Sequence, residues 1–297
     1  MIDPEGDPVF RRLSLALLTL AALTSCATPA TPTTPAPAAT VTQPDFAALE
    51  KTFGARLGVY AIDTGTGREI AYHADDRFAY ASTHKVFTAA AILHRGDDLH
   101  RMITVRSSDL VPYSPITEKH LDTGMSLQSV LDAALRYSDN TAGNLMFREI
   151  GGPEGLTADL HRSGDTVTHV DRIEPALNDT APGDIRDTTT PRAWAADLRA
   201  AVLGSALGPD RQAVLTGMMR ASTTGGNLIR AGVPDGWQVA DKTGTADYAT
   251  RNDIAVVWPP NRAPIVLAVL SDRPQKDAKA DDKLIAQATA AVVKVLP

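Results

Sequence analysis

Residues 82–93, Ser-Thr-His-Lys-Val-Phe-Thr-Ala-Ala-Ala-Ile-Leu, place a serine hydroxyl and a lysine amine three positions apart at the start of a predicted helix. The apolar run after Lys85 predicts that this helix is buried. Because positions i and i+3 share a helix face, Ser82 and Lys85 are expected to face each other. A serine hydroxyl becomes a nucleophile when a base accepts its proton, and a desolvated lysine amine can be that base. By itself, a serine three residues before a lysine more often marks a solvated helix face.

The rest of the chain divides into strands near both ends and helices between them. Hydrophobic periodicity predicts strands at 57–62, 69–72, 237–243, 253–258 and 265–270, and helices at 45–53, 82–93, 127–137, 141–150, 155–162, 191–203, 211–219 and 281–296. Gly151-Gly152-Pro153 ends one helix, and Thr190-Pro191 supplies a cap and a first-turn proline to another.

This order of elements predicts an α+β fold. The terminal strands are expected to join in one antiparallel sheet of about five strands, flanked by the first and last helices. We therefore predict an α/β domain from 45–75 and 228–297, with a helical domain at 76–227 inserted between its halves. A cleft between two such parts is a usual place for a ligand.

Composition narrows the range of functions. The chain has 297 residues, is 43% hydrophobic and carries a net charge of −6, so it can bury a full core. Its basic residues form no cluster longer than Arg11-Arg12, which argues against a nucleic-acid partner. The seven histidines never fall at a metal-ligand spacing, so we expect no metal site and no cofactor.

The N-terminus predicts export. Arg11-Arg12 precede the apolar run 13–23, which is too short to span a bilayer but suits a signal peptide at 1–26. Leu23-Thr24-Ser25-Cys26 resembles a bacterial lipobox, and Cys26 is the only cysteine. We expect a lipid on Cys26, followed by an extended Pro/Thr/Ala-rich tether at 27–44 that holds a monomeric domain at the cell envelope. The alternative is an incidental cysteine in a signal peptide cleaved elsewhere, with a secreted or periplasmic product.

Two further motifs favour a functional interpretation of the serine-lysine pair. Ser138-Asp139-Asn140 lies in the break between two predicted helices, and Lys242-Thr243-Gly244 ends a predicted strand. Each alone is an ordinary helix-capping loop or strand end. In the order Ser-x-x-Lys, Ser-Asp-Asn, Lys-Thr-Gly they resemble the motif set of class A β-lactamases, within the superfamily of penicillin-binding proteins and transpeptidases. The resemblance extends from Asp45 to the C-terminus.

The resemblance implies a set of roles. Ser82 would attack a β-lactam carbonyl to form an acyl-enzyme, while the backbone N–H groups of Ser82 and Thr245 stabilise the oxyanion. Ser138 would pass a proton to the departing ring nitrogen, assisted by the charge of Lys242. The implied substrate contacts are Thr243, Gly244, Thr245 and Arg251 toward the drug's carboxylate, Asn140 toward its side-chain amide, and Tyr113 at the mouth of the cleft.

Deacylation needs a base that activates water. Residues 172–178, Arg-Ile-Glu-Pro-Ala-Leu-Asn, resemble the class A segment that supplies this base, with Glu174 as base and Asn178 helping to position the water. Arg172 and Asp187 are expected to pair and to close residues 172–187 as an Ω-loop.

Two positions depart from the family pattern. His84 stands where an aromatic or aliphatic residue is commoner, and Ala246 stands where many relatives have glycine. Helix geometry points His84 off the face of Ser82 and Lys85, so we expect a packed residue near the site and not a base.

Two other functions use the same motifs. A peptidoglycan D-alanyl-D-alanine carboxypeptidase or transpeptidase would lack the role of Glu174 and would stay acylated by penicillin. A non-hydrolytic penicillin-sensing lipoprotein would tolerate loss of Lys85. Either Lys85 or Glu174 can serve as the acylation base on this pattern.

Overall fold

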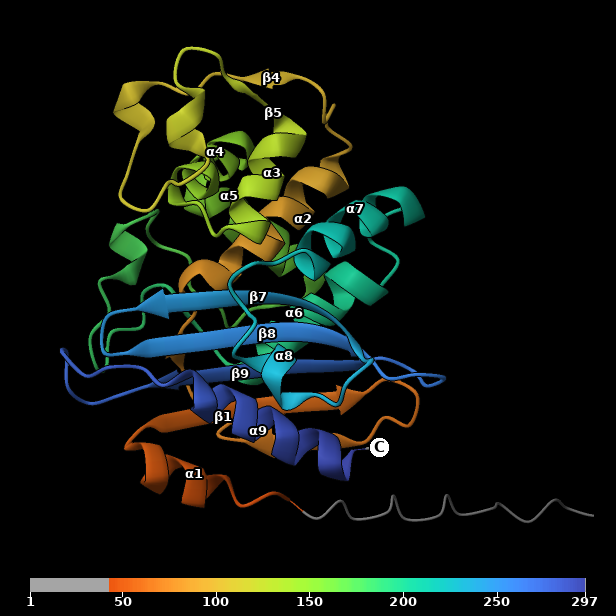
Figure 1. The fold of residues 1–297 in the computed structure, drawn as a ribbon. Coiled ribbons are helices and arrows are strands. Elements are labelled where there is room, and N and C mark those ends of the chain that lie inside the picture. The colour runs from red at the N-terminus through yellow and green to blue at the C-terminus, as the bar shows by residue number, and fades with distance from the viewer. Residues whose placement is uncertain (1–42, 297) are drawn as a thin grey trace, which may run out of the picture. The chain divides into compact units, whose positions relative to one another are not determined.

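A five-stranded antiparallel sheet organises residues 43–296, the part of the chain that this computed structural model describes (Figure 1). The signal peptide, Cys26 and all but the last two residues of the tether lie outside the described residues. The strands are β1 (Arg56–Asp63), β2 (Glu69–Tyr72), β7 (Gln238–Ala246), β8 (Thr250–Trp258) and β9 (Ile265–Asp272). Their order is β2-β1-β9-β8-β7, so β1 pairs with β9 and the two ends of the chain share one sheet, as predicted.

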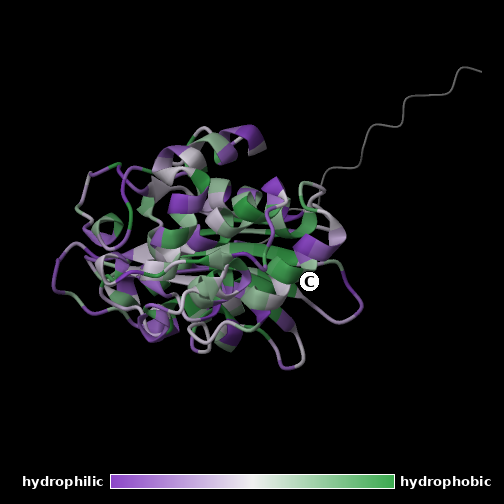
Figure 2. Cartoon of the chain, turned by 90° about the horizontal axis from the view of Figure 1, so that it is seen from above, coloured by the Kyte–Doolittle hydropathy of each residue, from purple (hydrophilic) through white to green (hydrophobic). Residues whose placement is uncertain are grey.

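Both faces of the sheet are buried because its central strands are apolar on both sides. Along β9, Leu267 and Val269 belong to one hydrophobic core, while Val266 and Ala268 belong to another. The first core is closed by α1 (Phe46–Phe53) and α9 (Asp282–Val295), which are the flanking helices that the sequence predicts. The second core lies against the remaining helices. Figure 2 shows the hydrophobic sheet between these two helical layers.

Six helices between β3 and β7 form the second layer (Figure 1). They are α2 (Lys85–Arg95), α3 (Leu127–Arg136), α4 (Asn140–Ile150), α5 (Gly152–Ser163), α6 (Pro191–Leu203) and α7 (Pro209–Arg220). The single turn α8 (Ile229–Gly232) packs instead on α9 and contributes Ile229 to the first core. The predicted cap of α6 is confirmed, since the Thr190 side chain accepts a hydrogen bond from the backbone N–H of Ala193. This helix packs on β1, β8 and β9, so it joins the helical layer to the sheet.

Two of the element boundaries that differ from the predictions bear on the site. Ser82 does not lie in the α-helix but in a 3₁₀ turn, η1 (Ala81–His84), which leads into α2 at Lys85. Residues i and i+3 eclipse in a 3₁₀ turn, so Ser82 and Lys85 still share a face. The Lys242-Thr243-Gly244 motif is internal to β7 and does not end it, because pairing with β8 continues to Ala246.

Short elements complete the described chain. The strand pairs are β3 (Phe78–Ala79) with β6 (Thr188–Thr189), and β4 (Met102–Ile103) with β5 (Met125–Ser126). Three further 3₁₀ turns are η2 (Ser107–Asp109), η3 (Thr117–His120) and η4 (Ala176–Asn178). The domain boundaries at 75/76 and 227/228 stay a prediction. None of the helices within residues 43–296 has the length and apolarity that crossing a bilayer requires.

Trp194 of α6 fixes the turn that carries Ser82. Its fully buried indole stacks on Tyr80 at 5.4 Å between ring centroids and contacts the ring of Phe87 at 4.1 Å. The indole N–H donates a 2.7 Å hydrogen bond to the hydroxyl of Thr83, the residue after Ser82. An aromatic ring with a satisfied polar handle packs in one orientation, so α6 holds η1 rigidly over the sheet.

Asp197 on α6 makes the stability of the fold dependent on pH. Burial, together with the charge and the hydrogen bond of Asp165, raises the pKa of Asp197 to about 9. The folded protein therefore retains a proton that the unfolded chain releases near pH 4, and stability falls as pH rises between these values. We expect Asp197→Asn, which keeps a donor toward Asp165, to remove a decline on the order of 1 kcal/mol per pH unit. Urea unfolding at pH 5.5 and 8.5 measures it, and an unchanged decline in the variant contradicts the assignment.

Candidate functional site

The predicted site residues converge on one cavity of about 590 Å³ between the sheet edge and the helices. Its wall contains nine of them and two threonines that the motifs do not include; together these are Ser82, Tyr113, Ser138, Asn140, Asn178, Thr223, Thr224, Thr243, Gly244, Thr245 and Arg251. Lys85, Glu174 and Lys242 are fully or almost fully buried behind this wall. The cavity thus presents hydroxyl and amide groups to a ligand and keeps the ionisable groups behind them.

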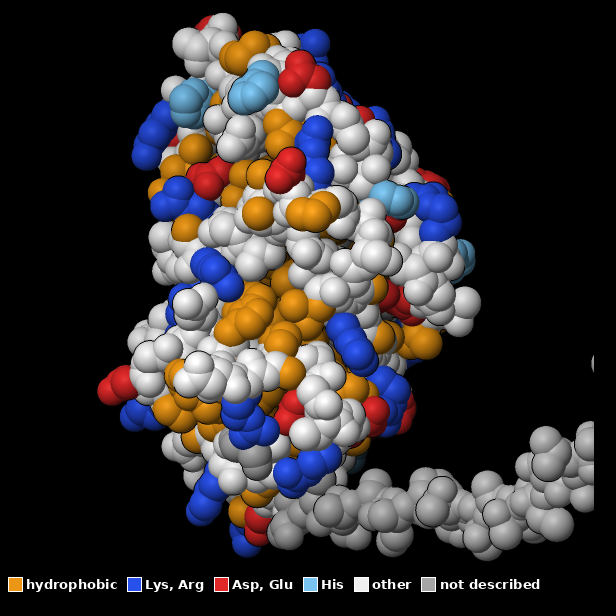
Figure 3. Space-filling model, turned by 90° about the vertical axis from the view of Figure 1, so that its right-hand side faces the viewer, with side chains coloured by type: hydrophobic (Ala, Val, Ile, Leu, Met, Phe, Trp, Pro, Cys, Tyr) orange, Lys and Arg blue, Asp and Glu red, His pale blue; other side chains and the backbone are white. Residues whose placement is uncertain are grey.

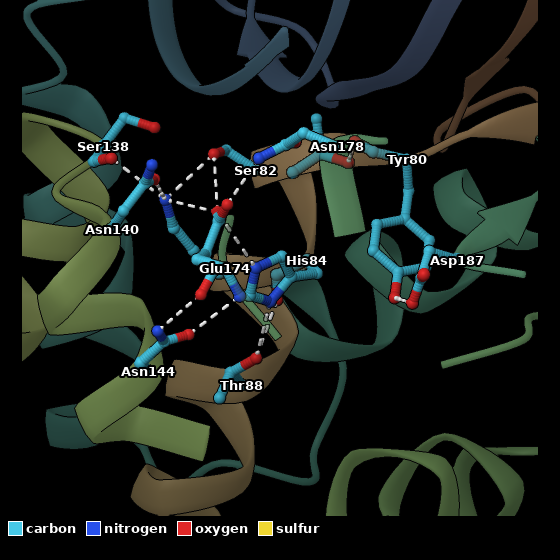
Figure 4. A network of polar contacts seen from close by, with 12 residues as sticks. Tyr80, Ser82, His84, Thr88, Ser138, Asn140, Asn144, Glu174, Asn178 and Asp187 are labelled. Atoms are coloured by element: carbon cyan, nitrogen blue, oxygen red, sulfur yellow. Dashed lines mark hydrogen bonds and ion pairs between the residues drawn. The ribbon is translucent and has the colours of Figure 1, made fainter. Parts of the chain in front are cut away.

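Ser82 and Lys85 meet as the spacing predicts. The Lys85 ammonium lies 2.9 Å from the Ser82 hydroxyl oxygen and also donates to the Ser138 carbonyl at 2.9 Å and to Asn140 Oδ1 at 2.8 Å (Figure 4). A fourth oxygen, Glu174 Oε1, lies 2.9 Å away. Since an ammonium group has three protons, these four oxygens compete for them. Lys85 is therefore held in one place by groups from three segments of the chain.

Gly143 of α4 makes room for this lysine. A Cβ atom at Gly143 would lie 2.7 Å from Lys85 Cε, which is closer than carbon atoms approach. The glycine therefore lets α4 pack directly on the Lys85 side chain, which brings Asn140 of the same helix into hydrogen-bonding distance.

The Glu174 carboxylate also contacts Ser82. Ser82 Oγ donates to Glu174 Oε1 at 3.1 Å, and the carboxylate is 2% exposed as a residue. Burial alone would raise the pKa of Glu174, but the charge of Lys85 and the contact with His84 outweigh it and hold this pKa well below its usual range. Glu174 is therefore ionised at neutral pH and can accept a proton from a hydroxyl or a water.

Two asparagines fix the position of Glu174. Asn144 of α4 accepts from the Glu174 backbone N–H and donates to its carbonyl, both at 2.8 Å. Asn178 donates to Glu174 Oε2 at 2.5 Å, and its buried Oδ1 has no hydrogen-bond partner among the described residues. Asn178 also lines the cavity. The backbone and one carboxylate oxygen are thereby held, and Oε1 remains toward Ser82.

Ser138 and Lys242 form a second pair. Lys242 Nζ donates to Ser138 Oγ at 2.9 Å and to the carbonyl of Thr243 at 2.8 Å. Burial, with the nearby charge of Lys85, lowers the pKa of Lys242 to about 7. Because Lys242 is 0% exposed, its charge reaches the cavity through Ser138 and through space, and not by direct contact with the solvent in the cavity.

The edge of the sheet forms one wall of the cavity. A Cβ atom at Gly244 would lie 2.9 Å from the Tyr80 carbonyl oxygen, so this glycine permits β7 to approach the η1 turn. Arg251 from β8 is oriented by Asp282 at 2.7 Å and donates to the hydroxyl of Thr245 at 3.0 Å. The positive guanidinium therefore lies beside the threonine hydroxyls of β7.

Tyr113 and Asn140 stand on the facing wall. Tyr113 is 61% exposed and has φ +64°, a left-handed conformation that is uncommon for an aromatic residue. Its carbonyl accepts from the Asn140 backbone N–H at 2.9 Å. Ser138 has φ +59°, so strained backbone occurs at two positions of this wall. Asp139, which lies between Ser138 and Asn140, caps α4 by accepting a hydrogen bond from the Ala142 backbone N–H.

The predicted pair Arg172 and Asp187 forms, with Arg172 Nε 2.5 Å from Asp187 Oδ2. The second oxygen of Asp187 accepts from Tyr80 Oη at 3.0 Å and from two backbone N–H groups, those of Asp171 and Arg172. Asp187 is completely buried. One carboxylate thus joins both ends of residues 172–187 to the segment that carries Ser82.

Sequence reasoning missed three polar residues of the site. Thr224 contacts the hydroxyl of Thr243 at 2.7 Å, and Thr223 lines the cavity beside it, but neither belongs to a recognisable motif. Asn144 could have been found, because it follows Asn140 by one helical turn and so shares its face. His84 was expected to be packed near the site, and it is fully buried with Nε2 3.7 Å from Glu174 Oε1.

The described residues offer no obvious metal centre, since no three His, Cys, Asp or Glu side chains within 43–296 gather closely enough to bind an ion. Figure 3 shows that positive and negative side chains are mixed on the face it presents. The chemistry available in the cavity is that of a serine hydroxyl with a carboxylate–lysine pair behind it and cationic groups near Ser138 and Thr245.

Comparisons with known proteins agree with this chemistry. The profile of the Beta-lactamase enzyme family matches residues 42–296. A β-lactamase of Bacillus amyloliquefaciens is 56% identical to this chain, covering 84% of this chain and 82% of its own length, and one of Amycolatopsis lactamdurans is 52% identical, covering 88% of both. The crystal structure of a class A β-lactamase from Clostridium kluyveri superposes with a TM-score of 0.82 at 48% identity, covering 84% of this chain and 96% of that one. The crystal structure of a halotolerant bacterial β-lactamase gives 0.84 at 52% identity, covering 85% and 98%.

Proposed function

The chain belongs to the β-lactamase enzyme family as a class A serine β-lactamase that hydrolyses β-lactams, and on this premise we propose how its own residues carry out the two steps of the reaction. The observation that carries the proposal is the contact of one hydroxyl, Ser82 Oγ, with both Lys85 at 2.9 Å and Glu174 at 3.1 Å.

In the first step, Ser82 Oγ attacks the β-lactam carbonyl and the C–N bond of the ring breaks. The Ser82 proton passes to Glu174 Oε1, or to the neutral amine of Lys85 once that residue has given a proton to Glu174; both groups are within hydrogen-bonding distance of the hydroxyl. The backbone N–H groups of Ser82 and Thr245 are proposed to stabilise the oxyanion. This assignment is supported by the close approach of β7 to η1 at Gly244, which brings the two backbones together.

The departing ring nitrogen needs a proton, and we assign its delivery to Ser138. The 2.9 Å contact with Lys242 supports this role, because an ammonium donor stabilises a hydroxyl that is losing its proton. Ser138 and Lys242 are distinct from the groups that receive the Ser82 proton, so the two proton transfers use separate groups.

Substrate binding uses the two walls of the cavity. The hydroxyls of Thr243 and Thr245, beside Arg251, suit the carboxylate that penicillins and cephalosporins share, and Gly244 keeps this wall flat. On the facing wall, Asn140 is assigned to the side-chain amide of the drug, and exposed Tyr113 to apolar contact at the cavity mouth.

In the second step, Glu174 takes a proton from the water that attacks the ester carbon. Its carboxylate is ionised, fixed by Asn144 and Asn178, and adjacent to the Ser82 oxygen that carries the acyl group. The free Oδ1 of Asn178 is suited to orient that water. A base so placed favours hydrolysis over the persistent acyl-enzyme of a carboxypeptidase or transpeptidase. Arg172 and Asp187 hold the segment that presents it.

Replacement of Glu174 separates the two steps. In Glu174→Ala the ester should still form but should not be hydrolysed, because no other described carboxylate contacts Ser82. We expect a burst of nitrocefin cleavage followed by turnover at least about 10²-fold slower, with a penicilloyl adduct detected by intact-mass spectrometry. The matched control Ser82→Ala should give neither burst nor adduct. Deacylation of Glu174→Ala at the wild-type rate would disprove the role of Glu174.

Lys242 should determine the alkaline limb of the pH profile. Its pKa of about 7 means that the free enzyme loses this charge as pH rises above neutrality. We expect kcat/KM, which reports the free enzyme, to fall by as much as about tenfold per pH unit above this pKa. Lys242→Arg keeps a charge at every accessible pH, so its profile should be flat there even if its maximum is lower. An identical alkaline limb in both proteins would assign the limb to another group.

We further propose that the enzyme is an exported, monomeric lipoprotein. The signal-like segment 1–26, the lone Cys26 in a lipobox-like context and the Pro/Thr/Ala-rich residues 27–44 support this assignment. With Cys26 acylated and the catalytic part beginning near Asp45, the tether would keep the cavity clear of the membrane surface.

Cys26→Ser tests the anchor. In a bacterial host, the wild-type protein should partition with membranes, and the variant should appear as active enzyme in the soluble fraction. Mass spectrometry of the wild-type N-terminus should show a diacylglyceryl cysteine. A soluble wild-type enzyme that begins after residue 26 would contradict the proposal.

A further inference from the structure

His84 is a buried imidazole whose outer nitrogen faces the carboxylate assigned to deacylation. Its ring stacks on Phe147 at 4.8 Å between centroids and lies 5.9 Å from the ring of Tyr80. Nδ1 is 3.1 Å from Thr88 Oγ1. Nε2 has no hydrogen-bond partner among the described residues, and its nearest acidic oxygen is Glu174 Oε1 at 3.7 Å (Figure 4).

The surroundings of His84 favour a neutral ring. Burial lowers the pKa of His84, and Lys85 and Lys242 lower it further, whereas Glu174 raises it. The other titratable group against the ring is Tyr80, whose burial and contact with Asp187 raise its pKa well above the usual value, so its phenol stays neutral. At neutral pH the imidazole therefore carries one N–H group.

The position of that single proton follows from the two neighbours. If Nδ1 carried it, the lone pair of Nε2 would point toward a buried carboxylate, which is repulsive. If Nε2 carries it, the N–H group points toward Glu174, and Nδ1 can accept a hydrogen bond from the Thr88 hydroxyl. The second arrangement removes the repulsion at Nε2, which outweighs the 3.1 Å hydrogen bond from the Thr88 hydroxyl to the His84 carbonyl that is exchanged for one to Nδ1.

We propose that His84 is a positioning residue for deacylation: its neutral imidazole, with the proton on Nε2, directs an N–H group at Glu174 Oε1 and holds that oxygen where it activates water. The inference rests on the role of Glu174 proposed above. Asn144 holds the backbone of Glu174 and Asn178 holds Oε2. Ser82 donates to Oε1 only until its oxygen is acylated, so His84 is the neutral donor that stays beside Oε1 during deacylation. Below its own pKa, protonated His84 would add a second cation beside Lys85 and make Glu174 a weaker base.

Two variants separate the N–H group from the packing of the ring. His84→Phe keeps an aromatic ring against Phe147 and removes the donor, whereas His84→Gln places an amide N–H near the position of Nε2. Rapid-quench mass spectrometry with benzylpenicillin gives the acylation and deacylation rate constants separately. For His84→Phe we expect deacylation to fall about fivefold, the effect of one modest hydrogen bond, with acylation nearly unchanged. The acid limb of its kcat profile should move to higher pH, because Glu174 loses a contact that keeps it ionised.

The control and the contrary outcomes are distinct. His84→Gln should recover most of the deacylation rate and the wild-type acid limb; a His84→Phe profile identical to wild type, or a His84→Gln profile identical to His84→Phe, would overturn the inference. If Glu174→Ala accumulates the adduct while His84→Phe has the deacylation rate and pH profile of the wild type, only the proposed role of His84 is wrong. If Glu174→Ala deacylates normally, the proposed function itself fails.

A measurement on the wild-type enzyme keeps the test independent of the folding of the variants. The ¹⁵N NMR spectrum of the histidine-labelled protein, with His84 assigned from its loss in His84→Gln, reports which ring nitrogen carries the proton. We expect the Nε2–H tautomer at neutral pH, and a shift of that signal in Glu174→Gln. The Nδ1–H tautomer would overturn the proposal.

Discussion

The buried ion pair of Lys85 and Glu174 is the interaction on which the site depends. Its atoms lie 2.9 Å apart, and both side chains are excluded from solvent. Desolvation of two charges costs more than a single contact returns, so such a pair persists only when further hydrogen bonds complete it. Here the hydrogen bonds of the Lys85 ammonium group are accepted by Ser82, Ser138 and Asn140. Glu174 is positioned by Asn144 and Asn178. The groups assigned to catalysis and the groups that stabilise the ion pair are therefore largely the same atoms.

The fold brings these groups together from distant segments by holding the η1 turn from two sides. Trp194 holds the η1 turn from the helical layer, and β7 approaches the same turn from the sheet at Gly244. Asp187 joins the Ω-loop to Tyr80, two residues before Ser82. All three contacts are made by the η1 turn that carries Ser82 or by the residue next to it. They hold this turn in place, while the cavity wall beside it remains polar.

Most of the charged groups in the site are buried behind the cavity wall. Lys85, Lys242 and Glu174 are buried, while the wall that a substrate meets consists of hydroxyls, amides and the partly neutralised Arg251. The pKa values of Glu174 and Lys242 are both lowered, but for different reasons. At Glu174 the charge of Lys85 and the contact with His84 outweigh burial, whereas at Lys242 burial is the main cause and the charge of Lys85 adds to it. His84 belongs to this buried set, which is why a residue that touches no substrate can affect the reaction.

The sequence alone determined the α+β order of elements, the pairing of terminal strands in one sheet and most of the cavity wall, because periodicity, caps and the three spaced motifs are local signals. It did not determine that Ser82 lies in a 3₁₀ turn or that β7 continues to Ala246, since these depend on packing by Trp194 and on pairing with β8. It also could not place Thr224 or bring His84 within 3.7 Å of Glu174. Those contacts join residues far apart in the chain, and only tertiary packing decides which distant side chains share a buried space.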